Sequence, residues 1–135
     1  MKLTINYSPP DKIEYYNLFE STGWNTNYRM SPGLLYEALN NSWFLVCVYN
    51  DSKLIGFGRV ISDGVLHALI VDLIISPDVQ NCGIGRLILK ELVAKCKSAA
   101  ITDIQLFSAK GKEGFYIKQG FKSRSSDAPG MEFIG

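Results

Sequence analysis

Two glycines separated by one residue lie in the segment QNCGIG, between a strongly apolar run and a segment with helical periodicity. The first turn of a helix carries unpaired backbone N–H groups and the positive end of the helix dipole. Glycines at that point let an anionic ligand approach the backbone closely. Gly83 and Gly85 therefore predict a phosphate-binding turn, and the alternative interpretation is a plain loop with a glycine turn.

Two other phosphate-binding signatures do not fit this segment. A Walker P-loop needs the pattern G-x-x-x-x-G-K-[ST], which the sequence does not contain. A dinucleotide fingerprint needs a third glycine where Ile88 stands, and its acidic residue would be Asp103, at the start of the next predicted strand rather than at its end. Three consecutive strands before the glycines also disagree with an opening βαβ unit, so we expect neither motif.

The elements that must position this turn follow from the hydrophobic pattern. Period-two alternation and turn residues predict strands, and apolar residues at helical spacing predict helices. An antiparallel meander followed by a strand–helix–strand unit indicates an α+β fold, in one domain over residues 1–135. The predicted strands are 3–8, 42–50, 54–62, 65–76, 101–109, 120–125 and 131–135, and the predicted helices are 11–22, 33–41, 85–98 and 112–119.

Composition narrows the function classes. The chain has 135 residues, a net charge of +1 and 47% hydrophobic residues, so we expect a globular domain that binds neither nucleic acid nor a membrane surface. Cys47, Cys82 and Cys96 are widely separated, which indicates neither a disulfide framework nor a metal site. The first ten residues are too polar for a signal peptide, so we expect the protein to be located in the reducing cytoplasm.

The hexapeptide QNCGIG resembles the [QR]-x-x-G-x-[GA] pyrophosphate-binding signature of the GNAT superfamily of coenzyme A-dependent N-acetyltransferases. Its surroundings are similar to that family too: DLIISPDVQNCGIG to the central strand and loop, and GFYIKQGF to a later F-Y-x-K-x-G-F segment. The resemblance extends over about residues 43–121. It implies the GNAT fold, a twisted, mostly antiparallel mixed sheet of six to seven strands flanked by about four helices, and acetyl-CoA as cosubstrate.

The resemblance also implies which residues bind the coenzyme. In the family, backbone N–H groups of the glycine loop hold the pyrophosphate, and the preceding strand pairs with the pantetheine arm. In the family an asparagine is common seven residues before the tyrosine that corresponds to Tyr116. This position is Ala109 here, so Ser108 or Lys110 would have to replace its contact with the coenzyme. Carried over, the coenzyme-binding residues are Leu73, Ile74, Ile75, Gln80, Asn81, Cys82, Gly83, Ile84, Gly85, Arg86 and Ser108.

Two side chains are candidates for proton transfer. The resemblance implies that Tyr116 protonates the departing coenzyme A thiolate, the alternative being an ordinary half-buried tyrosine. Asp72 interrupts the apolar run LIVDLII, and a buried carboxylate needs a partner. It would act as the base for the acceptor ammonium, directly or through water, or form an ion pair with Arg59; the sequence leaves both open. We expect His67 to be a surface residue.

Acceptor recognition in similar proteins falls to the loop between the first two helices and to the last hairpin. These segments supply Trp24, Tyr28, Arg29 and Asp127. The aromatic side chains would form the walls of an amine pocket and the charged ones would bind the acceptor; the alternative interpretation is a packed loop with solvated charges. The near-neutral charge favours a small-molecule amine (an aralkylamine, polyamine or amino sugar). Protein N-terminal or lysine acetylation and a non-catalytic acyl-CoA-binding or protein-interaction module are the alternatives. The resemblance further implies a homodimer formed through the C-terminal strands.

Overall fold

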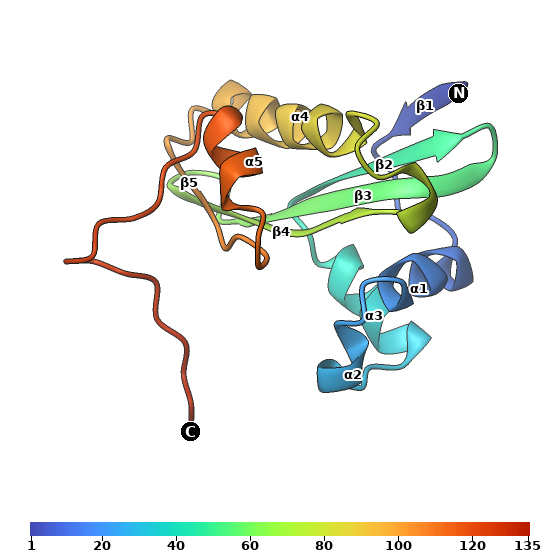
Figure 1. The fold of residues 1–135 in the computed structure, drawn as a ribbon, viewed down its shortest axis with the longest axis horizontal. Coiled ribbons are helices and arrows are strands. Elements are labelled where there is room, and N and C mark those ends of the chain that lie inside the picture. The colour runs from blue at the N-terminus through green and yellow to red at the C-terminus, as the bar shows by residue number, and fades with distance from the viewer.

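A computed structural model describes all of residues 1–135 as one mixed sheet with helices on both faces (Figure 1). The sheet order is β1-β2-β3-β4-β5, in which β1 to β4 are antiparallel neighbours and β5 runs parallel to β4. This architecture confirms the predicted α+β class. The strands are β1 (Leu3–Asn6), β2 (Phe44–Asn50), β3 (Lys53–Ser62), β4 (His67–Ile75) and β5 (Asp103–Leu106); the helices are α1 (Lys12–Glu20), α2 (Asn25–Tyr28), α3 (Pro32–Asn40), α4 (Ile84–Ser98) and α5 (Glu113–Lys118), with a 3₁₀ turn η1 (Pro77–Val79).

The two faces of the sheet are covered by different helices, α4 on one side and α1 with α3 on the other (Figure 1). Strand β2 is apolar at consecutive positions because it is buried on both faces. Its Val46 and Val48 pack in the cluster with α4, whereas Leu45 and Cys47 pack in the cluster with α1 and α3. None of the helices is long and apolar enough to cross a bilayer.

Strand β4 contains a bulge at Asp72, whose φ of +55° is unusual for a residue other than glycine. The register with β3 shifts there, because Arg59 pairs with Val71 while Phe57 pairs with Ile74. One residue of β3 therefore lies opposite two residues of β4, and the strand bends.

The bulge changes which residues of β4 face α4. Before it, Ala68 and Ile70 belong to the α4 cluster, and after it Leu73 and Ile75 pack there. Without the additional residue at position 72, the second half of the strand would present the opposite alternation. The bulge thus directs Leu73 and Ile75 toward the start of α4.

Strand β5 leaves β4 before β4 ends. The pairing runs only from His67 opposite Asp103 to Ile70 opposite Leu106, while β4 continues to Ile75. The backbone groups on this edge of β4 from 71 to 75 consequently have no strand partner.

The sheet has five strands rather than the six to seven predicted, because the segments 120–125 and 131–135 form no strand. The connecting run KSRSSDAPG is polar and contains Pro and Gly, so it buries little surface against β5. After α5 the chain instead leads away from the body of the molecule (Figure 1), and Phe133 and Ile134 are 90% and 96% exposed. A fifth helix, the short α2, lies within the segment that the sequence predicts to be a loop.

Candidate active site

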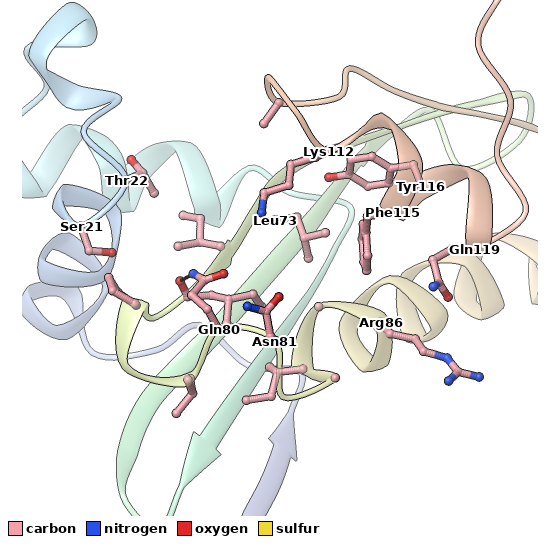
Figure 2. Close-up of a pocket in the computed structure, with 18 of the residues that line it drawn as sticks. Ser21, Thr22, Leu73, Gln80, Asn81, Arg86, Lys112, Phe115, Tyr116 and Gln119 are labelled. Carbon is pink, nitrogen blue, oxygen red and sulfur yellow. Dashed lines mark hydrogen bonds between the residues drawn. The ribbon is translucent and has the colours of Figure 1, made fainter.

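A cavity of about 540 Å³ lies at the open edge of β4. The connection from α1 to α2 forms one wall, the loop after β4 and the start of α4 form the floor, and α5 forms the opposite wall (Figure 2). It is lined by Ser21, Thr22 and Trp24; by Leu73, Ile74 and Ile75 of β4; by Pro77, Val79, Gln80, Asn81, Gly83, Ile84, Gly85 and Arg86; and by Ala109, Lys112, Phe115, Tyr116 and Gln119.

The glycine turn presents unused backbone donors to this cavity. Gly83 is the N-cap of α4, has a φ of +81° and supplies no side chain to cap the helix. The N–H groups of 83–86 have no acceptor within the chain, since the first bond in the turn runs from Leu87 N–H to the Gly83 carbonyl. A Cβ added to Gly83 would meet no protein atom within 4 Å, so the space above the turn is open. This arrangement is suited to an anion.

The loop before the turn is held in place by side chains. Gln80 donates from Nε2 to the Ile75 carbonyl at 2.8 Å, which ties the loop to the end of β4. At the surface, Lys53 Nζ lies 3.1 Å from Asp78 Oδ2. The amide of Gln80 is therefore engaged in shaping the loop, whereas Asn81 extends toward the cavity (Figure 2).

Tyr116 lies on α5 at the edge of the cavity. Its ring is half-buried and makes edge-on contacts with Phe115 and Phe121, at centroid distances of 5.1 Å and 6.2 Å. Burial raises the pKa of the Tyr116 phenol above its ordinary value. Its hydroxyl points toward the cavity (Figure 2), where a neutral phenol has a proton to donate.

Asp72 is paired with Arg59. Its Oδ2 accepts a hydrogen bond of 2.8 Å from Arg59 Nε, and the two side chains are 21% and 12% exposed. The same guanidinium donates to the Ala38 carbonyl and to Ser42 Oγ, both at 3.3 Å. The Asp72 side chain does not line the cavity. Of the two interpretations left open by the sequence, the ion pair is the one present in the structure.

The other residues predicted for coenzyme binding divide into two groups. Leu73, Ile74, Ile75, Ile84 and Gly85 line the cavity, as do the remaining loop residues apart from one. The exception, Cys82, is exposed on the outer side of the loop with Sγ 3.6 Å from the Gln80 carbonyl. Ser108 also lies outside the lining and donates to the Ala109 carbonyl, while Ala109 itself lines the cavity.

The predicted acceptor residues are likewise only partly together. Trp24 lines the cavity, but Tyr28, Arg29 and Asp127 do not, and Asp127 lies in the exposed C-terminal segment. His67 is exposed at the far end of β4, where its Nδ1 is hydrogen-bonded to Asp103. No group of three or more His, Cys, Asp or Glu side chains is placed to bind a metal ion.

Several lining residues were not predicted from the sequence. Lys112, Phe115 and Gln119 are the N-cap, an internal residue and the C-cap of α5, and they share the three- and four-residue spacing that places side chains on one face of a helix. That spacing around Tyr116 could have predicted these cavity residues from the sequence. Ser21 and Thr22 follow α1, and only the tertiary packing of α1 beside the end of β4 brings them to the cavity.

Comparison with known proteins identifies the family. The acetyltransferase (GNAT) domain model matches residues 18–130, and the chain belongs to this family of acetyltransferase enzymes. It is 31% identical over 147 residues to the uncharacterized N-acetyltransferase ycf52 of Pyropia yezoensis, covering 96% of this chain and 84% of that protein. It is also 32% identical over 79 residues to serotonin N-acetyltransferase 2, chloroplastic, of Oryza sativa subsp. japonica, covering 58% of this chain and 40% of that one.

Solved structures of similar fold support the same family. The GNAT family acetyltransferase SP0256 from Streptococcus pneumoniae TIGR4 superposes with a TM-score of 0.83 at 26% identity, over 99% of this chain and 98% of that chain. The GNAT fold and the enzyme class predicted from the sequence are thereby confirmed.

Proposed function

We propose that this enzyme transfers the acetyl group of acetyl-CoA to the primary amine of a small molecule, by direct attack within a ternary complex. The proposal rests on one observation: the open edge of β4, the glycine turn and Tyr116 lie along one continuous surface. The unpaired edge of β4 from 71 to 75 leads to the free N–H groups of 83–86, in the same cavity that holds the Tyr116 hydroxyl.

The shape of this surface suits an extended ligand with amide groups and a terminal pyrophosphate. Exposed strand edges pair with extended chains through backbone hydrogen bonds, and a helix N-terminus binds phosphate. Leu73, Ile75 and Phe115 supply apolar contacts along the path between them. Gln80 would act indirectly, by holding the loop in its open form.

The chemistry requires three bond changes. The amine nitrogen attacks the thioester carbonyl carbon, the C–S bond breaks, and the departing thiolate takes the phenolic proton of Tyr116. The attacking amine must first lose a proton from its ammonium form, and the nitrogen loses a second proton as the amide forms, which returns the Tyr116 phenolate to the phenol. No carboxylate lines the cavity. We assign both proton losses to water in the cavity and give Asp72 a structural role, since it is bound by Arg59. Holding both substrates in register supplies much of the rate enhancement.

A small acceptor is supported by the dimensions of the site and by one relative. A cavity of about 540 Å³ is of the size that binds small molecules. Trp24 forms part of its wall and would pack against an apolar amine. The rice relative named for serotonin acetylation makes amines with an aromatic group the first acceptors to test.

The proposal is tested by measuring thiol release from acetyl-CoA in the presence of a panel of amines. The panel should contain aralkylamines, polyamines, amino sugars, amino acids and peptides with free N-terminal or lysine amines. We expect release that depends on at least one small amine, with the acetylated amine detected by mass spectrometry. Release with peptides alone would contradict the small-molecule assignment.

We further propose that residues 1–135 act as one domain within a homodimer. The open edge of β5 and the exposed apolar tail, with Met131 at 85% and Phe133 at 90% exposure, would both be covered by a second copy. All three cysteines are free thiols, which suits a reducing compartment. Light scattering on the eluted protein should give twice the mass of 15.1 kDa, and deletion of 131–135 should return it to the monomer.

A further inference from the structure

We infer that the acceptor amine carries an anionic group, a carboxylate or a phosphate, and that Lys112 binds it. This inference rests on the proposed function and narrows its substrate class. It follows from the distribution of charge in the cavity.

The cavity is lined by two cationic side chains and by no Asp or Glu. They differ in direction, because Arg86 extends away from the cavity while the Lys112 ammonium extends into it above Leu73 (Figure 2). Only Lys112 thus places its charge inside the space where a substrate would lie.

Lys112 forms no ion pair within the chain. None of the salt bridges includes it, and the lysine that donates a side-chain hydrogen bond is Lys53 instead. The carboxylates of the surrounding elements contact other side chains and not Lys112: Asp72 and Asp78 form ion pairs with Arg59 and Lys53, and Glu20 and Glu113 accept hydrogen bonds from Asn25 and Ser123. A ligand oxyanion would therefore complete an ion pair that the protein does not make by itself.

The position of Lys112 assigns the anion to the acceptor rather than to the coenzyme. The pyrophosphate site proposed above lies at the glycine turn, on the floor of the cavity, where four N–H groups are free. Lys112 comes from the N-cap of α5 on the opposite wall, and its ammonium extends toward the side of the cavity where Thr22 lies (Figure 2). It would repel a polyamine and attract an amine that carries a negative group.

The amine itself would lie near Tyr116. Lys112 and Tyr116 are one helical turn apart, since the Tyr116 N–H donates to the Lys112 carbonyl at 3.3 Å. An acceptor with both charges would then have its anion at Lys112 and its amine at the thioester, whose sulfur must lie within reach of the Tyr116 hydroxyl.

The experiment compares amines that differ only in the anionic group. Phenylalanine is paired with phenethylamine, and O-phosphoethanolamine with ethanolamine, in thiol-release assays with acetyl-CoA. The variant is Lys112→Gln, and the matched control is Lys118→Gln, which removes a charge from the last turn of α5 outside the cavity. We expect the wild type to prefer the anionic member by about tenfold in kcat/KM, Lys112→Gln to abolish the preference, and Lys118→Gln to keep it.

Two results would overturn the inference. The first is equal or better use of the neutral member in every pair that reacts. The second is an unchanged preference in Lys112→Gln together with weaker binding of CoA, because the lysine would then serve the phosphates of the coenzyme.

Failure of the proposed function gives a different pattern. If no amine is acetylated although CoA binds, the proposed function fails, and the inference is decided by melting temperatures of the CoA-bound protein. Stabilisation by the anionic amines that is lost in Lys112→Gln supports the inference, and the absence of such stabilisation overturns it.

Discussion

Arg59 and Asp72 join two strands at the bulge of β4, with Nε and Oδ2 2.8 Å apart. The pair fixes a backbone conformation of positive φ that few residues adopt, and the guanidinium also reaches the end of α3 through the Ala38 carbonyl. Because the bulge directs Leu73 and Ile75 toward the start of α4 and the cavity, the pair supports the site without lying in it.

Replacing Asp72 with Asn should therefore lower stability and leave the chemistry almost intact. Asn tolerates positive φ, so the bulge is kept, while the partly buried Arg59 loses its counter-charge at a cost of about 1–3 kcal/mol. We expect kcat to stay within about threefold of the wild type, since a general base contributes about 10²- to 10⁴-fold. Urea unfolding and thiol-release kinetics on the same sample check both statements.

The opposite pattern would identify Asp72 as the catalytic base. In that case kcat would fall by at least about 100-fold with little change in the free energy of unfolding. Arg59→Gln serves as the companion variant, because it should destabilise the fold in the same manner.

Gly83→Ala should weaken coenzyme binding more than it weakens the fold. The φ of +81° makes alanine unfavourable by about 1–2 kcal/mol, but its methyl group meets no protein atom. The methyl group would occupy the space proposed for the pyrophosphate, so we expect a loss of at least about tenfold in CoA affinity. Isothermal titration calorimetry measures it.

Gly120→Ala is the matched control for that variant. Gly120 also has a positive φ, +97°, and open space at the Cβ position, but it follows α5 outside the cavity. It should show a similar loss of stability with unchanged CoA affinity. Equal affinities in the two variants would argue against a phosphate site at the glycine turn.

Tyr116→Phe should remove turnover while retaining the coenzyme. The ring contacts with Phe115 and Phe121 are kept, and only the hydroxyl is lost. We expect kcat to fall about 10²- to 10⁴-fold at an unchanged dissociation constant for acetyl-CoA. Tyr16→Phe, on α1, is the control that should keep full activity. Activity of Tyr116→Phe close to that of the wild type would exclude the phenol as the acid.

The free energy of unfolding should fall as the solution becomes alkaline. Burial raises the pKa of the Cys47 thiol from 9.0 to about 12, so above pH 9 the unfolded chain loses a proton that the folded chain keeps. Stability from this group is complete below pH 9 and declines as the pH rises toward 12, by about 1 kcal/mol between pH 9 and 10. Urea unfolding at both pH values should show a loss about 1 kcal/mol smaller in Cys47→Ala. Identical losses in the two proteins would show that the thiol titrates alike in both states.

The sequence alone predicted those features that depend on residues close together in the chain. The segment QNCGIG predicted a turn with free N–H groups at a helix start, and the structure has that turn at Gly83. The apolar runs of β2 and β4 predicted buried strands, because burial on both faces needs apolar residues at every position.

The remainder depended on contacts between distant residues. Whether Asp72 meets Arg59 depends on the register across the bulge, and position 72 gives no local sign of its positive φ. Ser21 and Thr22 reach the cavity only through the packing of α1. The C-terminal segments alternate like strands, but a strand forms only where it can pair and bury a face, and the short β5 offers four residues.

The most direct test of the coenzyme site is thermal unfolding of the protein with acetyl-CoA, CoA and NAD in parallel. A ligand at about 100 times its dissociation constant stabilises a protein by roughly 2.7 kcal/mol, which for a chain of this size raises the melting temperature by roughly 8 °C. We predict this rise with acetyl-CoA and with CoA, and no rise with NAD. The absence of a rise with either coenzyme A species would contradict the proposal that the edge of β4 and the turn at Gly83 bind the coenzyme.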